Sequence, residues 1–183
     1  MPKLAGRYDK HMKLKTPYYS QFTDVQDKYW MPRACLPVCL KIILSYHGKA
    51  NDVSVDTLIT DMNAKGGYYE NGWRHDHIVE KAKEFGFYAY RQEKMNEAQG
   101  IAELKKTLDA GNPVIVSVIK FILGQTKFHT VVLVGYEEKD AAISGFYFHD
   151  PESTSTDRNR EAFFVDIDTF KRQWRRMAIF IEK

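Results

Sequence analysis

The chain has 183 residues, of which 44% are hydrophobic and 14% aromatic, and its 27 basic and 24 acidic side chains leave a net charge of +3. This size suffices for one well-buried domain, and the interspersed charges argue against a nucleic-acid partner. No apolar run approaches the roughly 20 residues of a membrane span, so we expect no membrane insertion and, unless a secretion signal has been removed, a cytoplasmic location. The two cysteines, Cys35 and Cys39, are four residues apart, and this spacing excludes a disulfide framework. Two cysteines alone are also too few ligands for a zinc site.

The N-terminal region is basic and polar, and we expect residues 1–15 to be a mobile arm or an expression-tag remnant. Residues 16–183 then form a single domain that begins with an extended segment at 16–21. The aromatic pair Tyr29 and Trp30 precedes the most apolar part of the chain.

Residues 34–48 predict a central helix, because apolar side chains at helical spacing face nearly every direction. Only Lys41 and Ser45 form a polar stripe, and Gly48 suits the position just past the helix end. Cys35 lies at the helix N-terminus, where free backbone N–H groups and the helix dipole favour a thiolate. Cys35 is therefore a candidate nucleophile; the alternative is a small buried hydrophobic side chain.

The other elements follow an order in which helices come first and strands later. Apolar periodicity and turn residues predict helices at 53–64, 74–85, 101–110 and 166–174, and strands at 87–91, 114–119, 129–136, 145–150, 163–165 and 177–181. This order indicates an α+β domain.

The Gly-rich and aromatic loop at 66–73 predicts the lip of a binding cleft, although exposed tyrosines also cap cores without a function. Together with aromatic residues before the central helix, this loop supplies five candidate substrate-binding residues: Tyr19, Trp30, Tyr68, Tyr69 and Trp73. His75 and His77 are two residues apart on the next helix and point away from each other. We interpret them as surface histidines and not as a metal pair.

The strands at 129–136 and 145–150 predict a hairpin with a candidate base. If Gly135 pairs with Ser144, counting along both strands places His129 opposite Asp150 on the same sheet face. The carboxylate would accept a hydrogen bond from the N–H of one imidazole nitrogen and leave the other nitrogen free as a base, whereas His149 would face the other way. The alternative is a cross-strand pair of satisfied polar groups.

Gln21 precedes Cys35 by 14 residues, so its amide could fold back as a donor above the sulfur. A nucleophile at a helix N-terminus, a base and its orienting carboxylate are typical of Cys-His-Asp catalysis. The chain order of this candidate set is Gln21, Cys35, His129, Asp150.

Five sequence blocks carry a resemblance to a known family: 18–21 (YYSQ), 34–35 with 44–48 (AC and LSYHG), 111–116 (GNPVIV), His129 with 131–136 (VVLVGY), and Asp150 with Pro151. Over roughly residues 16–182 the chain resembles the bacterial bacteriocin-processing peptidases that act on double-glycine leaders, and above all their stand-alone relatives without a transporter. The resemblance implies a papain-like fold with a central N-terminal helix packed on an antiparallel sheet. It also implies Cys35 as nucleophile, His129 as base, Asp150 as its orienting partner and Gln21 in the oxyanion hole. One position departs from the pattern, because the family usually has Gly where this chain has Leu36.

These observations favour a cysteine peptidase that hydrolyses peptide or amide bonds in a peptide or protein substrate, without a metal or cofactor. Two alternatives on the same fold stay open: a catalytically weak peptide-binding module, which Leu36 would favour, and a thiol-dependent acyl or amide transferase. Metal-dependent hydrolysis through His75, His77 and His149 is the least favoured option. The sequence does not indicate an oligomeric state.

Overall fold

The computed structural model describes residues 9–70, 72–120, 127–154 and 158–183. The helices are η1 (Met31–Arg33, a 3-10 turn), α1 (Cys35–Tyr46), α2 (Val55–Ala64), α3 (His75–Glu84), α4 (Glu97–Asp109) and α5 (Ile167–Gln173). The strands are β1 (Lys10–Lys13), β2 (Tyr68–Tyr69), β3 (Gly72–Trp73), β4 (Tyr88–Gln92), β5 (Val114–Ile119), β6 (Phe128–Lys139), β7 (Ala142–His149), β8 (Phe163–Asp166) and β9 (Trp174–Glu182).

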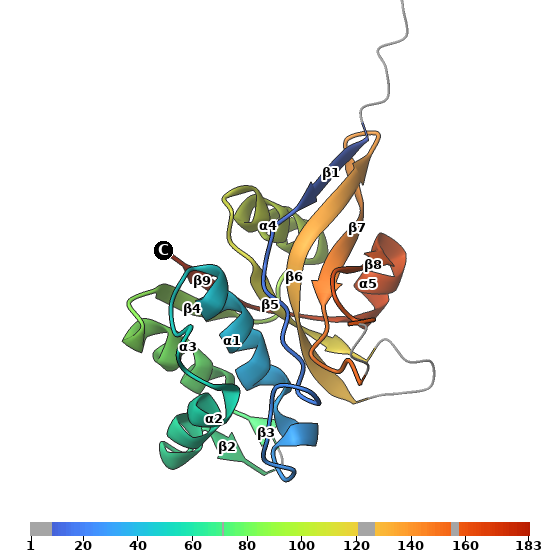
Figure 1. The fold of residues 1–183 in the computed structure, drawn as a ribbon. Helices are drawn as coiled ribbons and strands as arrows, with labels where there is room; N and C mark the ends of the chain where they lie inside the picture. Colours follow the sequence, from blue (N-terminus) through green and yellow to red (C-terminus); the bar gives the residue numbers. More distant parts are fainter. Residues whose placement is uncertain (1–8, 71, 121–126, 155–157) are drawn as a thin grey trace, which may run out of the picture.

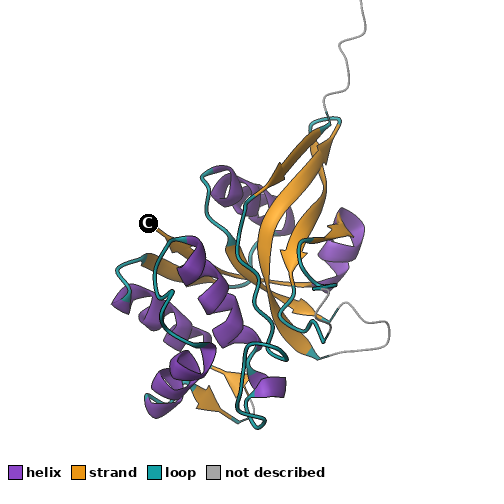
Figure 2. Cartoon of the chain, in the orientation of Figure 1, coloured by secondary structure: helices purple, strands orange, loops and turns teal. Residues whose placement is uncertain are grey.

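One antiparallel sheet organises the fold (Figure 1). Among the described residues it has seven strands in the order β4-β9-β5-β6-β7-β8, with β1 paired to β6, while β2 and β3 form a separate small hairpin. Helices α1, α2 and α3 gather on one side of the sheet (Figure 2). No helix in the described ranges is both long and apolar enough to cross a membrane. This arrangement confirms the predicted α+β class.

Alternation along the strands divides the core between the two sheet faces. In β6, Val132 and Val134 pack with α1, α2 and α3, whereas Val131 and Leu133 pack with α4 and α5. Neighbouring strand residues point to opposite faces, so one apolar strand supplies both halves of the core.

Helix α1 is the central helix that the sequence predicts. All of its residues from Leu36 to Leu44 are buried, and they pack against β6, α2 and α3. Even Lys41, part of the predicted polar stripe, is only 3% exposed, and its ammonium donates to the Ala50 carbonyl at 2.6 Å. Burial on all sides fixes the position of Cys35 at the N-terminal end of this helix.

Most predicted elements agree with the structure to within a few residues. Strand β5 has the predicted bounds, and α2 begins two residues later than predicted because Ser54 caps it by accepting from the Thr57 amide at 3.0 Å. The largest difference is α4, which begins at Glu97 and not at residue 101. Asn96 caps it by accepting from the Gln99 amide at 3.1 Å, a signal that the apolar pattern alone misses.

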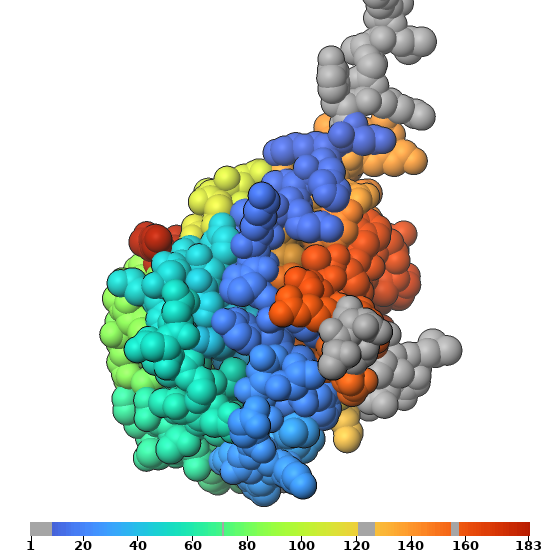
Figure 3. Space-filling model, viewed as in Figure 1, coloured from blue at the N-terminus to red at the C-terminus, as the bar shows by residue number. Residues whose placement is uncertain are grey.

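The N-terminal segment differs from the expected mobile arm at residues 10–13, which form β1 and pair with β6 from Gly135 to Glu138. The Lys13 ammonium lies 3.7 Å from the centroid of the Tyr147 ring. This cation–π contact stabilises the end of β1 against the sheet. Residues 1–8 lie outside the described residues. In Figure 3 the described part of the N-terminal region, from residue 9 onward, forms a blue strip between the cyan and green helical part and the orange sheet part.

The predicted register of the β6–β7 hairpin is wrong. Val132 pairs with His149 and Leu133 with Phe148, so one more step would place Asp150 level with Val131 and not with His129. Irregularities in the ladder, one of them between Leu133 and Gly135, shift the pairing. The shift at the His149 end is two residues, and because side chains alternate with a period of two, the predicted faces are preserved.

Candidate active site

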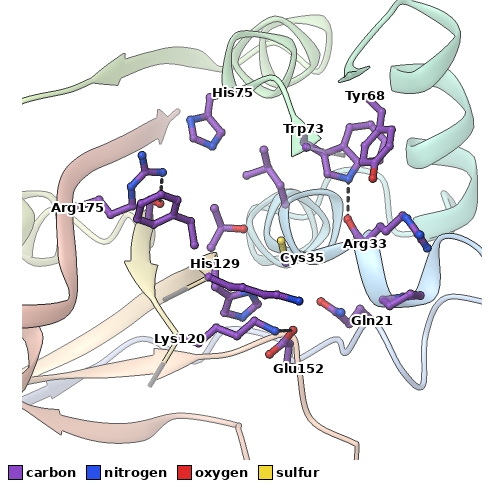
Figure 4. Close-up of a pocket in the computed structure, with 17 residues that line it drawn as sticks. Gln21, Arg33, Cys35, Tyr68, Trp73, His75, Lys120, His129, Glu152 and Arg175 are labelled. Carbon is purple, nitrogen blue, oxygen red and sulfur yellow. Dashed lines mark hydrogen bonds and ion pairs between the residues drawn. The ribbon is translucent and has the colours of Figure 1, made fainter. Parts of the chain in front are cut away.

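A cavity of about 650 Å³ opens where the N-terminus of α1 meets the ends of β5 and β6 (Figure 4). Cys35, His129 and Gln21 all line it. Three parts of the chain that are distant in sequence therefore supply these groups: the segment before η1 supplies Gln21, helix α1 supplies Cys35 and strand β6 supplies His129.

Cys35 is the first residue of α1 and is partly exposed to the cavity. The preceding residue, Ala34, provides no side-chain cap, so the first backbone N–H groups of the helix stay available. Burial raises the pKa of the Cys35 thiol, but the His129 imidazole within hydrogen-bonding reach, aided by Thr130, lowers this pKa more. The net pKa lies below the ordinary value, so the site favours a thiolate.

His129 and Asp150 form a buried pair. Nε2 of His129 lies 2.6 Å from Oδ1 of Asp150, and the two side chains are 2% and 6% exposed. Burial lowers the pKa of His129, whereas Asp150 and Cys35 raise it well above its usual range. Burial raises the pKa of Asp150, whereas His129 and the Glu152 amide, which donates to Oδ1 at 2.9 Å, lower it overall. An ionised carboxylate can only accept hydrogen bonds, so the Nε2–H of His129 donates to Asp150. Nδ1 of His129 is then left to interact with the Cys35 sulfur.

Gln21 is 1% exposed, and its Oε1 has no hydrogen-bond partner among the described residues. Its backbone is held in place, because its amide donates to the Pro151 carbonyl at 2.8 Å. Ser20 Oγ donates to the same carbonyl at 3.1 Å and to the Ser153 carbonyl at 2.5 Å. A carboxamide that is fixed at its backbone and free at its end can turn its NH₂ group toward the cavity.

The second cysteine, Cys39, lies one turn deeper in α1 and is fully buried. Its sulfur donates to the Thr130 carbonyl at 3.4 Å, and burial together with Cys35 raises its pKa well above the ordinary value. Cys39 therefore has the properties of an inert core thiol.

Two of the five predicted substrate-binding aromatics, Tyr68 and Trp73, line the cavity. Trp30 packs behind them, with ring centroids 5.0 Å from Tyr68 and 5.5 Å from Trp73. Tyr19 does not line the cavity but lies along α1, with its hydroxyl 3.4 Å from Ser45 Oγ. Tyr69 is 64% exposed and also lies outside the cavity wall.

Sequence reasoning missed several charged and polar residues of the wall: Arg33, His75, Ser117, Lys120, Lys127, Glu152 and Arg175. His75, which the sequence suggests is a surface histidine, is half-buried and lines the cavity, and burial together with the charge of Arg91 lowers its pKa. Lys120 donates to Glu152 at 2.5 Å. These residues come from six separate stretches of the chain, and no local sequence pattern indicates that they meet.

One group of possible metal ligands occurs in the described part of the chain. The ligand atoms of His129, Asp150 and Glu152 lie within 4.8 Å of one another. His129 and Asp150 bind each other, and Glu152 binds Lys120. His149 lies elsewhere, since its Nε2 is 2.9 Å from Thr16 Oγ1, which agrees with the prediction that it faces away from Asp150.

The Peptidase_C39 like family model matches residues 13–179. The chain belongs to this family. Among solved structures, it is similar to a double glycine motif protease from an AMS/PCAT transporter in complex with the leader peptide (18% identity, TM-score 0.62, 93% of this chain and 94% of that one). It is also similar to the peptidase domain of Streptococcus ComA, a bi-functional ABC transporter involved in quorum sensing (22% identity, TM-score 0.57, 82% of this chain and 92% of that one).

Membership of the Peptidase_C39 like family confirms the resemblance to bacteriocin-processing peptidases, and the solved structures confirm the papain-like fold. A comparison with curated proteins gives no match.

Proposed function

We propose that this member of the Peptidase_C39 like family is a cysteine peptidase that hydrolyses peptide or amide bonds, with Cys35 as nucleophile, His129 as acid and base, and Asp150 as the orienting carboxylate. The observation that carries the proposal is the position of His129 between Cys35 and Asp150, which lowers the pKa of the thiol and raises that of the imidazole. A thiolate paired with an imidazolium is the reactive state of such a nucleophile.

In the first half of the reaction the Cys35 thiolate attacks the carbonyl carbon, an S–C bond forms and the carbonyl electrons move to oxygen. The Cys35 backbone N–H and the Gln21 amide donate to this oxyanion. The oxyanion then collapses, the C–N bond breaks, and Nδ1 of His129 gives its proton to the leaving amine.

In the second half of the reaction a water molecule attacks the carbonyl carbon of the thioester, and neutral His129 takes a proton from this water. The S–C bond breaks, the acid product leaves, and the thiolate and imidazolium are restored. Asp150 keeps its charge throughout and stabilises the imidazolium.

The cavity wall supports a peptide as substrate. Tyr68 and Trp73 offer flat apolar surfaces beside Cys35, and the Trp73 indole is held by donation to the Arg33 carbonyl at 2.8 Å. A similar protease was crystallised in complex with a leader peptide. Aromatic surfaces of this kind bind peptide side chains at a low cost in conformational entropy.

A peptide-binding module with weak chemistry is the second candidate. Leu36, where the family usually has Gly, is 1% exposed and contributes to both the cavity wall and the core. A bulky residue next to the nucleophile narrows the room for a tetrahedral intermediate.

Mass spectrometry of a peptide library incubated with the protein tests the proposal. We expect cleaved products carrying the mass of water, no cleavage with Cys35→Ala, and iodoacetamide modification of Cys35 at pH 6. Cleavage should continue in EDTA. Slow labelling without cleavage would favour the binding module, and products joined to an added amine in place of water would indicate a transferase.

A further inference from the structure

The charged residues of the cavity wall are unbalanced. Four of the described lining residues are Lys or Arg, namely Arg33, Lys120, Lys127 and Arg175, whereas Glu152 is the acidic one. Glu152 is already paired with Lys120. A cavity with a net positive wall attracts a ligand that carries negative charge.

Arg33 and Arg175 differ in how their charge is used. The Arg33 guanidinium donates to the Tyr29 carbonyl at 2.7 Å and stacks on the Tyr29 ring at 4.4 Å. Arg175 has no carboxylate partner in the ion pairs of the described residues. Glu93, which acts on Arg175 electrostatically, is itself paired with Arg91 at 3.6 Å. Arg175 is therefore a cation of the cavity wall whose charge is not neutralised by a carboxylate among the described residues.

The Arg175 guanidinium is also held in position. It lies 3.4 Å from the ring centroid of Phe128, and it donates to Ser117 Oγ at 3.4 Å (Figure 4). Stacking fixes the plane of the guanidinium, and its other N–H groups have no hydrogen-bond partner among the described residues. A planar fork that is fixed before binding suits a carboxylate, which it can bind through two parallel hydrogen bonds.

Strand pairing sets the backbone separation between His129 and the residues next to Arg175. Val118 in β5 pairs with His129 on one side and with Trp174, the neighbour of Arg175, on the other. Neighbouring strands lie about 4.8 Å apart, so the backbones of His129 and Trp174, two strands apart, are separated by roughly 10 Å. This distance corresponds to about three residues of an extended peptide.

From this geometry we propose that Arg175 is a specificity residue and that the cavity selects peptides with an Asp or Glu side chain two or three residues from the scissile bond. The substrate class is thus an acidic peptide segment. This inference rests on the proposed peptidase function, but the anionic subsite can be tested without turnover.

Alkylation of Cys35 by two reagents tests the subsite. Iodoacetate and iodoacetamide share a leaving group but differ in charge, so the ratio of their rates reports the charge of the cavity and cancels changes in thiolate content. We expect Arg175→Gln to lower the iodoacetate to iodoacetamide ratio by roughly threefold and Arg175→Glu by roughly tenfold. These differences should shrink in high salt.

The matched control is Arg172→Glu, which makes the same charge change on α5, at an exposed residue outside the cavity wall. It should change the ratio by less than about twofold. An unchanged ratio in Arg175→Glu, or an equal fall in Arg172→Glu, would overturn the proposal.

Peptide pairs that differ only as Glu and Lys, scanned over three positions on each side of a cleaved bond, test the selectivity. The wild type should cut the Glu peptide with a higher kcat/KM, by roughly three- to tenfold, and Arg175→Glu should reverse this preference. A wild-type preference for Lys would contradict the inference. If no peptide is cut, the peptidase function fails, while the alkylation ratio still decides on the anionic subsite.

Discussion

Nε2 of His129 lies 2.6 Å from Oδ1 of Asp150, although the two residues are not partners in the β6–β7 ladder. Asp150 follows the last residue of β7, and its backbone amide donates to the Arg160 carbonyl at 3.0 Å. The carboxylate thus reaches His129 from just beyond the strand end, where the Glu152 amide also holds it.

Replacing Asp150 by Asn should lower kcat by about 10²–10⁴-fold, because an amide can hold the imidazole in the wrong tautomer and no longer stabilises its charged form. The pKa of His129 should fall toward its ordinary value, since Asp150 is one of the groups that raise it. Steady-state kinetics and NMR titration of the imidazole measure the two effects. The control Glu152→Gln keeps the backbone amide that donates to Asp150 and should leave the His129 pKa nearly unchanged.

The two cysteines should behave in opposite ways. Cys35→Ala should lower the rate by on the order of 10³ or more, because it removes the nucleophile, whereas Cys39→Ala should keep activity and lose only a little stability. Peptide cleavage and thermal unfolding of both variants test this. If Cys35→Ala were active and Cys39→Ala inactive, the proposed assignment of Cys35 as the nucleophile would be wrong.

Gln21→Ala should slow turnover by about 10²–10³-fold, the usual effect of removing one oxyanion donor. The fold should be retained, because the Gln21 contact with the Pro151 carbonyl uses the backbone amide. Iodoacetamide should still label Cys35 at the wild-type rate, since that reaction has no oxyanion. Loss of both turnover and labelling would mean that Gln21 acts on the thiolate and not on the oxyanion.

The pH dependence of Cys35 alkylation should show a reactive thiolate below the ordinary thiol pKa of about 8.5, because His129 lowers the Cys35 pKa. In the proposed mechanism activity also needs the His129 proton, and the pKa of that group is raised. The dependence of kcat/KM on pH should therefore be bell-shaped. Its acid limb follows the lowered Cys35 pKa, and its alkaline limb lies above the ordinary histidine value of about 6.5. An alkaline limb at or below that value would contradict the ion pair.

The same pair should contribute to stability with a defined sign. The raised pKa of His129 stabilises the fold fully below about pH 6.5, and this contribution is lost as pH rises through the folded pKa. The lowered pKa of Asp150 stabilises the fold above about pH 3.9 and is lost as pH falls through the folded value. Urea unfolding across this range should show a smaller pH dependence in Asp150→Asn.

Leu36→Ala should lower the free energy of unfolding by about 2–5 kcal/mol, since it opens a void in the core behind α1. The exposed residue Lys49 provides a control, and Lys49→Ala should stay within about 0.5 kcal/mol. Urea unfolding with unchanged m-values measures both. A loss below about 1 kcal/mol would show that Leu36 belongs to the cavity and not to the core.

The sequence predicts those features that depend on local patterns. An apolar run on all sides indicates the central helix, a continuous β-branched run indicates β5, and both agree with the structure. Alternation along two strands predicts that His129 and Asp150 share one face, and this holds although the predicted register differs from the observed one by two residues.

Other features depend on contacts that no local pattern encodes. Arg175 reaches the cavity because β9 pairs with β5, and His75 does so because α3 begins at the cavity wall. Strand β1 forms from a basic segment because β6 continues beyond its pairing with β5, which ends at Leu133, so its backbone groups on that side are available from Gly135 to Glu138. Propensity is weak in such cases, since tertiary pairing decides the outcome.

The stretch that carries Asp150 also anchors the segment that carries Gln21, because the Pro151 carbonyl accepts from both Ser20 and Gln21. A backbone shift at Pro151 would disturb both the His129 imidazole and Gln21, the proposed oxyanion donor, in a single event. Amino-acid changes at 18–21 and at 150–153 should therefore show epistasis: during evolution, a change in one stretch is tolerated once the other has changed to match it.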